Sequence, residues 1–256
     1  MLVIAKHHEV LRGLSLDFLE GVKNYQGELI KNHKGRRDIQ RIKMSADGQP
    51  LVLFLKRNFK PYKKDGLKSL LTRGQVWSQS RTEWENSLAL QRAGLTVAEP
   101  VAFGEQCGPL WENFSFIITA GARGEMTLDE FIQHRTDPAE RQRVFAALAR
   151  QLRKMHEAGL ASPDLFTRHI FIERGGEPKF CLIDMARLDR RQKLSLKIRA
   201  RDLAALHVTA PLRCVSTEER QNFLKAYGDD GTLSQLIKER AKHLLKRRKF
   251  ADFVAT

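Results

Sequence analysis

Two aspartates, Asp164 and Asp184, flank a predicted β-hairpin in the second half of the chain. The segments His169–Glu173 and Lys179–Ile183 are rich in β-branched and aromatic residues, which favours strands. Between them Gly175-Gly176 suits a two-residue turn, because both glycines can adopt positive φ. The hairpin therefore folds the two aspartates toward each other.

The predicted register decides how close these side chains come. Pairing about the glycines puts Asp184 opposite Thr167, and directly opposed residues lie roughly 4.5–5.5 Å apart. Asp184 then leaves the hairpin beside the loop that carries Asp164, and His169 lies near both. Two carboxylates and an imidazole suit Mg²⁺-dependent phosphoryl transfer, in which one carboxylate orients the attacking hydroxyl and another holds the metal. The plainer alternative is that aspartates beside strands are turn and cap residues.

A lysine–glutamate pair is predicted in the first half. Lys56 ends the apolar run 51–55, where a lysine loses hydration unless an anion replaces it. Glu83 is the candidate partner, and Glu85 competes for that role.

Each member of this pair has an alternative. Lys56 can emerge into solvent at the end of its strand, where Arg57 and Lys60 are also basic. Glu83 fits a capping box that begins at Ser80, in which the glutamate only reaches back to the cap amide.

The elements that must position these residues fall into two halves. The first predicts strands and one helix, and the second predicts helices and the hairpin, with strands at 28–31, 38–44, 51–56, 97–103 and 114–119 and helices at 80–93 and from Asp137 to Gly159. The segment 120–124 contains two glycines and is predicted to be a hinge. We therefore expect an α+β, two-lobed fold: a β-rich nucleotide-binding lobe at 1–119 and a helical catalytic lobe at 120–256.

The order of the parts resembles the eukaryotic-like protein kinase fold: strand lysine, helix glutamate, hinge, long helix, loop aspartate, hairpin, second aspartate. The amino-acid sequence is most similar to one branch of this kinase superfamily. The motifs that carry the similarity include R-T-E-W-E at 81–85, M-H-E-A-G-L at 155–160, D-L-F-T-R-H-I-F-I at 164–172, L-I-D-M-A-R at 182–187 and R-D-L-A-A-L at 201–206. That branch is the lipopolysaccharide kinase (Kdo/WaaP) family, especially its core heptose kinases.

This resemblance implies ATP-dependent phosphorylation of a sugar hydroxyl, heptose or Kdo, on the lipopolysaccharide core at the cytoplasmic face of the inner membrane. It implies that Asp164 is the catalytic base, that Asp184 and His169 bind Mg²⁺, and that Lys56, held by Glu83, contacts the ATP phosphates. It further implies roles for Gly35 over the phosphates, for the backbone of Thr119, Ala120 and Gly121 at the adenine, and for Asp202 in holding the catalytic loop.

Three features depart from the kinase pattern. Ser162-Pro163 replaces the His-Arg pair before the catalytic aspartate, and His169 stands where protein kinases place a metal-binding asparagine. No GxGxxG loop is present, so only Gly35, followed by Arg36 and Arg37, remains to cover phosphates. These departures keep open a non-catalytic, kinase-like module that binds anionic glycolipid. A kinase for a protein or small-molecule acceptor is a further alternative.

Charge points to an acidic partner. The chain has 45 Lys+Arg against 30 Asp+Glu, a net charge of +15, with basic clusters at 56–68 and 238–249. The second cluster lies on a helix predicted after Thr232, which either lies on an anionic membrane surface or packs on the body with a solvated basic face. No RRM, KH or zinc-finger signature accompanies the charge, so no nucleic-acid partner is expected.

The three cysteines form no CxxC or Cys/His metal pattern, which is typical of a reducing compartment. The chain start shows no signal-peptide pattern and no window approaches 18 apolar residues. We expect a cytoplasmic protein, peripheral at the inner membrane.

Overall fold

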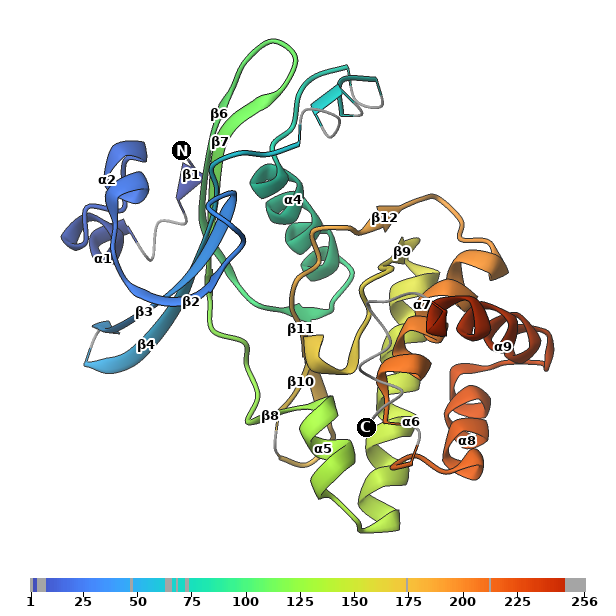
Figure 1. Cartoon of the computed structure of the whole chain (residues 1–256). Helices are drawn as coiled ribbons and strands as arrows, with labels where there is room; N and C mark the ends of the chain where they lie inside the picture. Colours follow the sequence, from blue (N-terminus) through green and yellow to red (C-terminus); the bar gives the residue numbers. More distant parts are fainter. Residues whose placement is uncertain are drawn as a thin grey trace. The chain divides into compact units, whose positions relative to one another are not determined.

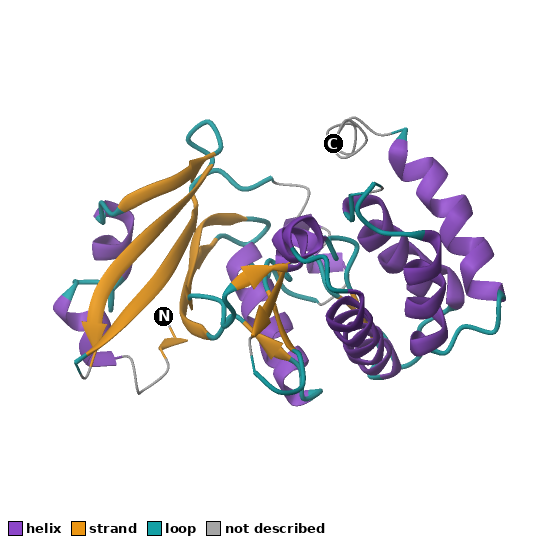
Figure 2. Ribbon diagram, turned by 90° about the horizontal axis from the view of Figure 1, so that it is seen from below, coloured by secondary structure: helices purple, strands orange, loops and turns teal. Residues whose placement is uncertain are grey.

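The computed structural model describes residues 2–3, 8–46, 48–62, 66–67, 69–71, 74–173, 175–211 and 213–246. The chain forms two compact units, and each is described by itself. The first comprises 1–88 and 98–121, and the second comprises 89–97 and 122–256. The first is built on a sheet and the second is mostly helical, so the fold is α+β as predicted (Figures 1 and 2).

An antiparallel sheet of six described strands forms the first unit. Its spatial order is β1-β6-β7-β4-β3-β2, with bounds β1 Leu2–Val3, β2 Glu28–Asn32, β3 Arg37–Ala46, β4 Gln49–Asn58, β6 Pro100–Cys107 and β7 Glu112–Ala120. The predicted strands of this half are all present, extended by a few residues at their ends. Residues 97–103, predicted as one strand, divide between β6 and β5 (Thr96–Val97), which belongs to the second unit.

Helices cover both faces of this sheet. Helices α1 (His8–Gly13) and α2 (Leu19–Asn24) lie on one face, and α4 (Gln79–Arg92) begins on the other (Figure 1). Apolar side chains of α1, α2 and the segment between them pack with Leu53 and Leu55 of β4 in one core. Because strand side chains alternate between faces, the even-numbered residues of β4 point toward α4.

The second unit combines short strands with five described helices. Its larger sheet has the order β5-β11-β10-β8, and a two-stranded pair joins β9 to β12, with bounds β8 Met126–Thr127, β9 Leu160–Ala161, β10 Ile170–Glu173, β11 Lys179–Leu182 and β12 Asp189–Arg190. The helices are α5 Leu128–His134, α6 Pro138–Glu157, α7 Leu196–Thr209, α8 Thr217–Tyr227 and α9 Thr232–Leu245.

Helix α6 forms as its sequence predicts. The Asp137 side chain accepts hydrogen bonds from the backbone N–H groups of Ala139 and Glu140, and Pro138 occupies the first turn. Gly159, at φ 76°, follows the helix end in the left-handed region. The apolar residues predicted at helical spacing are all buried in the core of the second unit: Val144, Leu148, Leu152 and Met155.

Helix α9 packs on the body of the second unit. Its apolar residues Leu233, Ile237, Ala241 and Leu244 are buried in the core, whereas Lys238, Lys242 and Lys246 are exposed. The alternative in which its apolar side lies on a membrane is therefore wrong for residues 232–245, since that side is already covered. The rest of the basic cluster, 247–249, lies outside the described residues. Within the described part of the chain, no helix combines the length and apolarity needed to cross a membrane.

Candidate active site

The hairpin that carries the two aspartates is present, with a register that differs from the prediction by one residue. Ile170 pairs with Leu182, and Glu173 pairs with Lys179, so more than the two glycines separates the paired strands. Pro178 lacks the N–H group of a ladder residue, so pairing starts only at Lys179. The predicted pairing of Asp184 with Thr167 is wrong.

His169 lies between the two aspartates, with one ring nitrogen facing each of them. Its Nδ1 lies 3.0 Å from the Asp164 carbonyl oxygen, and its Nε2 lies 4.0 Å from Asp184 Oδ2. Arg168 Nε donates to the same Nε2 at 3.4 Å, which agrees with a neutral ring protonated at Nδ1. Burial lowers the pKa of His169, although the Asp164 carbonyl and the Asp184 charge oppose this shift. The prediction that His169 lies near both aspartates is confirmed, although it contacts Asp164 through the backbone carbonyl rather than the carboxylate.

Asp184 itself has an unusual backbone. Its φ of 57° lies in the left-handed region, which L-residues other than asparagine and aspartate rarely adopt. Such conformations cost roughly 1–3 kcal/mol and gather at functional sites, where the surrounding structure holds them. The chain leaves β11 through this residue, so its conformation sets the direction in which the carboxylate departs from the hairpin.

Asp202, which is fully buried on α7, anchors the loop before Asp164 by hydrogen bonding. The Ser162 N–H donates to the Asp202 carboxylate, and the Asp164 N–H donates to Ser162 Oγ at 3.3 Å. Arg201 also binds Asp202, with Nη2 2.7 Å from Oδ1, so the buried carboxylate has a cation beside it as well as the loop amide. His156 Nε2 lies 3.4 Å from the same carboxylate. Ser162 thus supports the loop at the place where the kinase histidine is missing.

One contact of Asp164 has no counterpart in the sequence analysis. Arg187 Nη1 lies 3.1 Å from Asp164 Oδ1, and the Arg187 side chain is 64% exposed. The two residues are 23 positions apart in the sequence. The sequence feature they share is that each lies in a motif similar to the kinase family, and this feature does not predict their contact.

In the first unit, Lys56 and Glu83 form the predicted pair. Lys56 Nζ lies 2.6 Å from Glu83 Oε1, and the two side chains are only 13% and 8% exposed. The capping-box alternative is wrong, because Ser78 is the residue whose hydroxyl accepts from the first turn of α4, from the Arg81 N–H at 2.9 Å. Glu83 lies one turn further along, where its side chain reaches β4 rather than the helix end.

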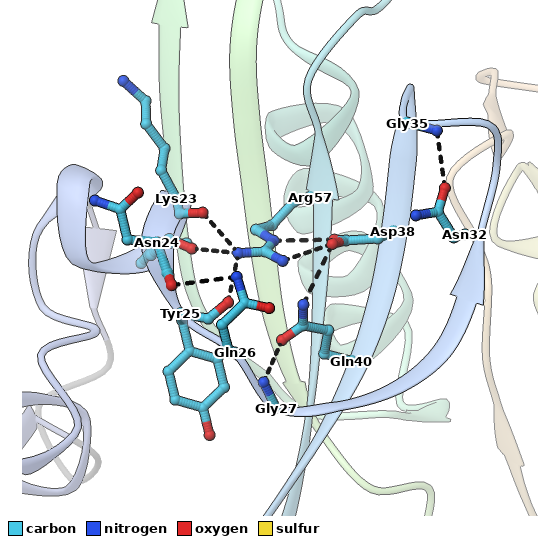
Figure 3. Close-up of polar contacts among 11 residues, drawn as sticks. Lys23, Asn24, Tyr25, Gln26, Gly27, Asn32, Gly35, Asp38, Gln40 and Arg57 are labelled. Atoms are coloured by element: carbon cyan, nitrogen blue, oxygen red, sulfur yellow. Dashed lines mark hydrogen bonds and ion pairs between the residues drawn. The ribbon is translucent and has the colours of Figure 1, made fainter.

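The alternative in which Lys56 emerges into solvent is wrong, since its side chain is 13% exposed, and the adjacent Arg57 is buried as well. As the next residue of β4 it points to the opposite face, and it is 2% exposed. Its Nε and Nη2 donate to the Asp38 carboxylate, and its Nη1 lies 2.9 Å from each of three carbonyl oxygens, those of Val22, Lys23 and Tyr25 (Figure 3). Arg57 therefore ties the end of α2 to the sheet.

The other nucleotide-site predictions fall at two places in the first unit. Gly35 lies in the exposed turn between β2 and β3 at φ 69°, where its N–H donates to Asn32 Oδ1 at 2.8 Å (Figure 3). Thr119 and Ala120 end β7. The Ala120 N–H donates to the Glu99 carbonyl and the Gly121 N–H to the Val52 carbonyl, each at 2.8 Å, so both amides are already engaged.

Residues 20–227 match the lipopolysaccharide kinase (Kdo/WaaP) family. The chain belongs to this family. It is 25% identical over 250 residues to the lipopolysaccharide core heptose(I) kinase WaaP of Pseudomonas aeruginosa, covering 91% of each chain. It is 26% identical over 221 residues to the Escherichia coli K12 enzyme of the same name, covering 82% of this chain and 81% of that one.

A solved structure supports the fold. The chain matches a structure described as WaaP in complex with acyl carrier protein, with a TM-score of 0.69, 23% identity and coverage of 99% and 98%. The expected kinase-like fold is therefore shown, and the family to which the chain belongs is one of lipopolysaccharide kinases.

Proposed function

We propose that this chain transfers the γ-phosphoryl group of ATP to a hydroxyl of a lipopolysaccharide core sugar, a heptose, with Kdo as the alternative acceptor. The observation that carries the proposal is the cluster of Asp164, His169 and Asp184, in a chain that belongs to a lipopolysaccharide kinase family. The heptose(I) kinases among its relatives favour heptose.

In this proposal Asp164 accepts the proton of the acceptor hydroxyl and orients it for attack. Its loop is suited to the task, because the Ser162 N–H donates to Asp202 and the Asp164 N–H donates to Ser162 Oγ, which holds the backbone at Asp164 in place. Lys56 contacts the α- and β-phosphates. Its buried bond to Glu83 holds the ammonium group in place and limits the rotamer entropy that binding would otherwise cost.

The residues present fit a magnesium ion that the nucleotide helps to bind. Asp184 would supply a hard oxygen ligand, and the neutral His169 would offer Nε2 beside it in place of the hydrogen bond from Arg168. No group of three or more His, Cys, Asp or Glu side chains suited to a metal occurs among the described residues, so phosphate oxygens and water would complete the shell. When bound, the ion would neutralise charge on the transferring phosphoryl group.

Phosphorylation of purified core oligosaccharide tests this function. The acceptor is prepared from cells that lack the protein, and transfer from radiolabelled ATP is measured with Asp164→Asn and Asp184→Asn. Loss of a general base lowers the rate by about 10²–10⁴-fold, and we expect at least this loss for Asp164→Asn. Asp137→Asn is the matched control: it is the same change on an exposed carboxylate of the same unit, and asparagine caps a helix equally well.

Wild-type transfer rates in both variants would refute the assigned site. The competing hypothesis, a non-catalytic module that binds glycolipid, predicts no transfer by the wild type and no heat on calorimetric titration with Mg·ATP. The buried Ser162, which supports the Asp164 amide, favours catalysis over that hypothesis. Phosphorylation of a protein or metabolite in place of the oligosaccharide would support the third alternative.

We also propose that the protein works at the cytoplasmic face of the inner membrane, held there by charge. A net charge of +15 and the exposed lysines of α9 support electrostatic binding to anionic lipid. Sedimentation with vesicles tests this. Binding to phosphatidylglycerol vesicles should fall steeply as salt is raised and be absent with phosphatidylcholine, whereas equal binding to both lipids would contradict it.

A further inference from the structure

The surface beside Asp164 concentrates cations that are not neutralised. The segment 185–199 contains six arginines and lysines and one acidic residue, Asp189. Asp189 is already paired, since its Oδ2 lies 2.6 Å from Arg201 Nη1. Among the described residues, no ion-pair partner is found for four exposed members of the segment: Arg190, Arg191, Lys193 and Lys197.

The fold brings this segment to the catalytic loop. Strand β12 pairs with β9, and Asp189 lies opposite Ala161, the residue before Ser162. Strands β9 and β12 lie side by side in the same unit (Figure 1), so the cationic segment runs next to the chain that leads into the Asp164 loop. Exposed like charges repel one another and oppose the compact state, so such a cluster is a marker for an anionic partner.

Arg187 is the member of this group that touches the catalytic carboxylate. Its guanidinium reaches Asp164 although most of its side chain lies in solvent. An exposed ion pair contributes little to stability, typically about 0–1 kcal/mol, so folding does not require it. A guanidinium also offers five donors in a planar fork, and one contact to Asp164 leaves others to bind a carboxylate or phosphate.

We propose that Arg187 is a positioning residue that binds Asp164 and an anionic group of the acceptor at the same time. The inference rests on the proposed function and adds to it a substrate requirement. The acceptor carries a carboxylate or phosphate close to the reacting hydroxyl, on the same sugar or the adjoining one. A hydroxyl bound to Asp164 at about 3 Å lies within reach of a guanidinium that is itself 3.1 Å from that carboxylate.

The test compares Arg187→Gln and Arg187→Lys with Arg143→Gln. Arg143 is an exposed arginine of α6 in the same unit, outside the cationic segment. With deacylated core oligosaccharide we expect Arg187→Gln to raise the acceptor KM at least tenfold and leave the ATP KM unchanged. Arg187→Lys should recover part of the loss, because it keeps the charge without the fork, and Arg143→Gln should match the wild type.

Altered acceptors identify the anion. One sample is treated with phosphatase and another has its carboxylates reduced to alcohols. On the sample that lacks the relevant group, the wild type should lose as much as Arg187→Gln does on native acceptor, and the variant should lose no more. This non-additivity is the signature of a direct pair. Losses that multiply on both samples, or an Arg187→Gln KM within twofold of the Arg143→Gln value, would overturn the inference.

Calorimetric binding of the same oligosaccharide separates this inference from the proposed function. Tenfold weaker binding to Arg187→Gln without any phosphoryl transfer by the wild type would support the anion site and refute the kinase assignment. Phosphoryl transfer by the wild type, with equal binding of the oligosaccharide to both proteins, would support the kinase assignment and refute the anion site.

Discussion

The buried Arg57–Asp38 pair predicts a large and localised loss of stability. The two side chains are 3% and 11% exposed, and Arg57 makes two bonds to Asp38 and three to carbonyl oxygens at the end of α2. Arg57→Met removes all five and leaves a buried carboxylate without its cation. Removing one partner of a buried pair costs about 3–5 kcal/mol. At a urea m-value of roughly 2 kcal/mol/M, the unfolding midpoint falls by about 1.5–2.5 M.

Tryptophan fluorescence reports this loss selectively. The three tryptophans, Trp77, Trp84 and Trp111, all belong to the first unit, and Trp84 is buried 5.1 Å from Phe103. The control is Lys43→Met in the same unit. Lys43 is 65% exposed and pairs with Glu28 at 3.3 Å, so we expect its loss to cost less than about 1 kcal/mol.

The double variant Arg57→Met/Asp38→Leu sharpens the test. It should recover part of the lost stability, because no buried charge is left unpaired, and only part, because the three carbonyl oxygens still lack their donor. A fluorescence midpoint for Arg57→Met no lower than that of Lys43→Met would refute the reasoning, since it would mean that the buried charge pair contributes no more than an exposed one in the same unit.

Two further predictions concern the site lysine and a buried histidine. Glu83→Gln removes the charge that holds Lys56. Hydrogen bonds to charged groups contribute about 1.5–3 kcal/mol, so kcat/KM for ATP should fall about 10–100-fold. Glu85→Gln is the control, and an equal fall in kcat/KM for both variants would contradict the Lys56–Glu83 pairing. Burial, with the adjacent Arg220 cation, lowers the pKa of His207 to about 4. The unfolded chain then takes up a proton below pH 6.5 that the folded chain does not, so stability present above that pH is lost as pH falls, by about 2 kcal/mol between pH 7.5 and 5. Urea unfolding followed by far-ultraviolet circular dichroism should show a smaller pH dependence for His207→Gln; an unchanged slope would exclude His207 as its source.

Local patterns were enough to predict the long strands of the first unit, helix α6 and the hairpin, but not the short helices α1 and α2 or the short strands β8, β9 and β12. Asp137 and Pro138 mark the start of α6 and Gly159 its end, because caps and terminators act over a few neighbouring residues. The strands of the hairpin were predicted to within one residue for the same reason. Its register was not, because the width of the turn depends on how Pro178 fits between strands already placed by their neighbours.

The residues of the candidate site were also predicted from the sequence. The order of Lys56, Glu83, Asp164 and Asp184 along the chain predicted a phosphoryl-transfer site, and the structure pairs the first two and gathers the last two around His169. That order came from resemblance and residue type, which the chain displays directly.

Only the tertiary structure decided which charges are buried and which remain available. Lys56 and Arg57 are adjacent basic residues with similar signals, yet strand alternation sends one toward Glu83 and the other beneath α2. Arg187 looks like any other surface arginine until β9 and β12 pair and bring its segment to Asp164. A sequence states that a side chain carries charge, but its partners come from segments far away in the chain, and their positions depend on the complete fold.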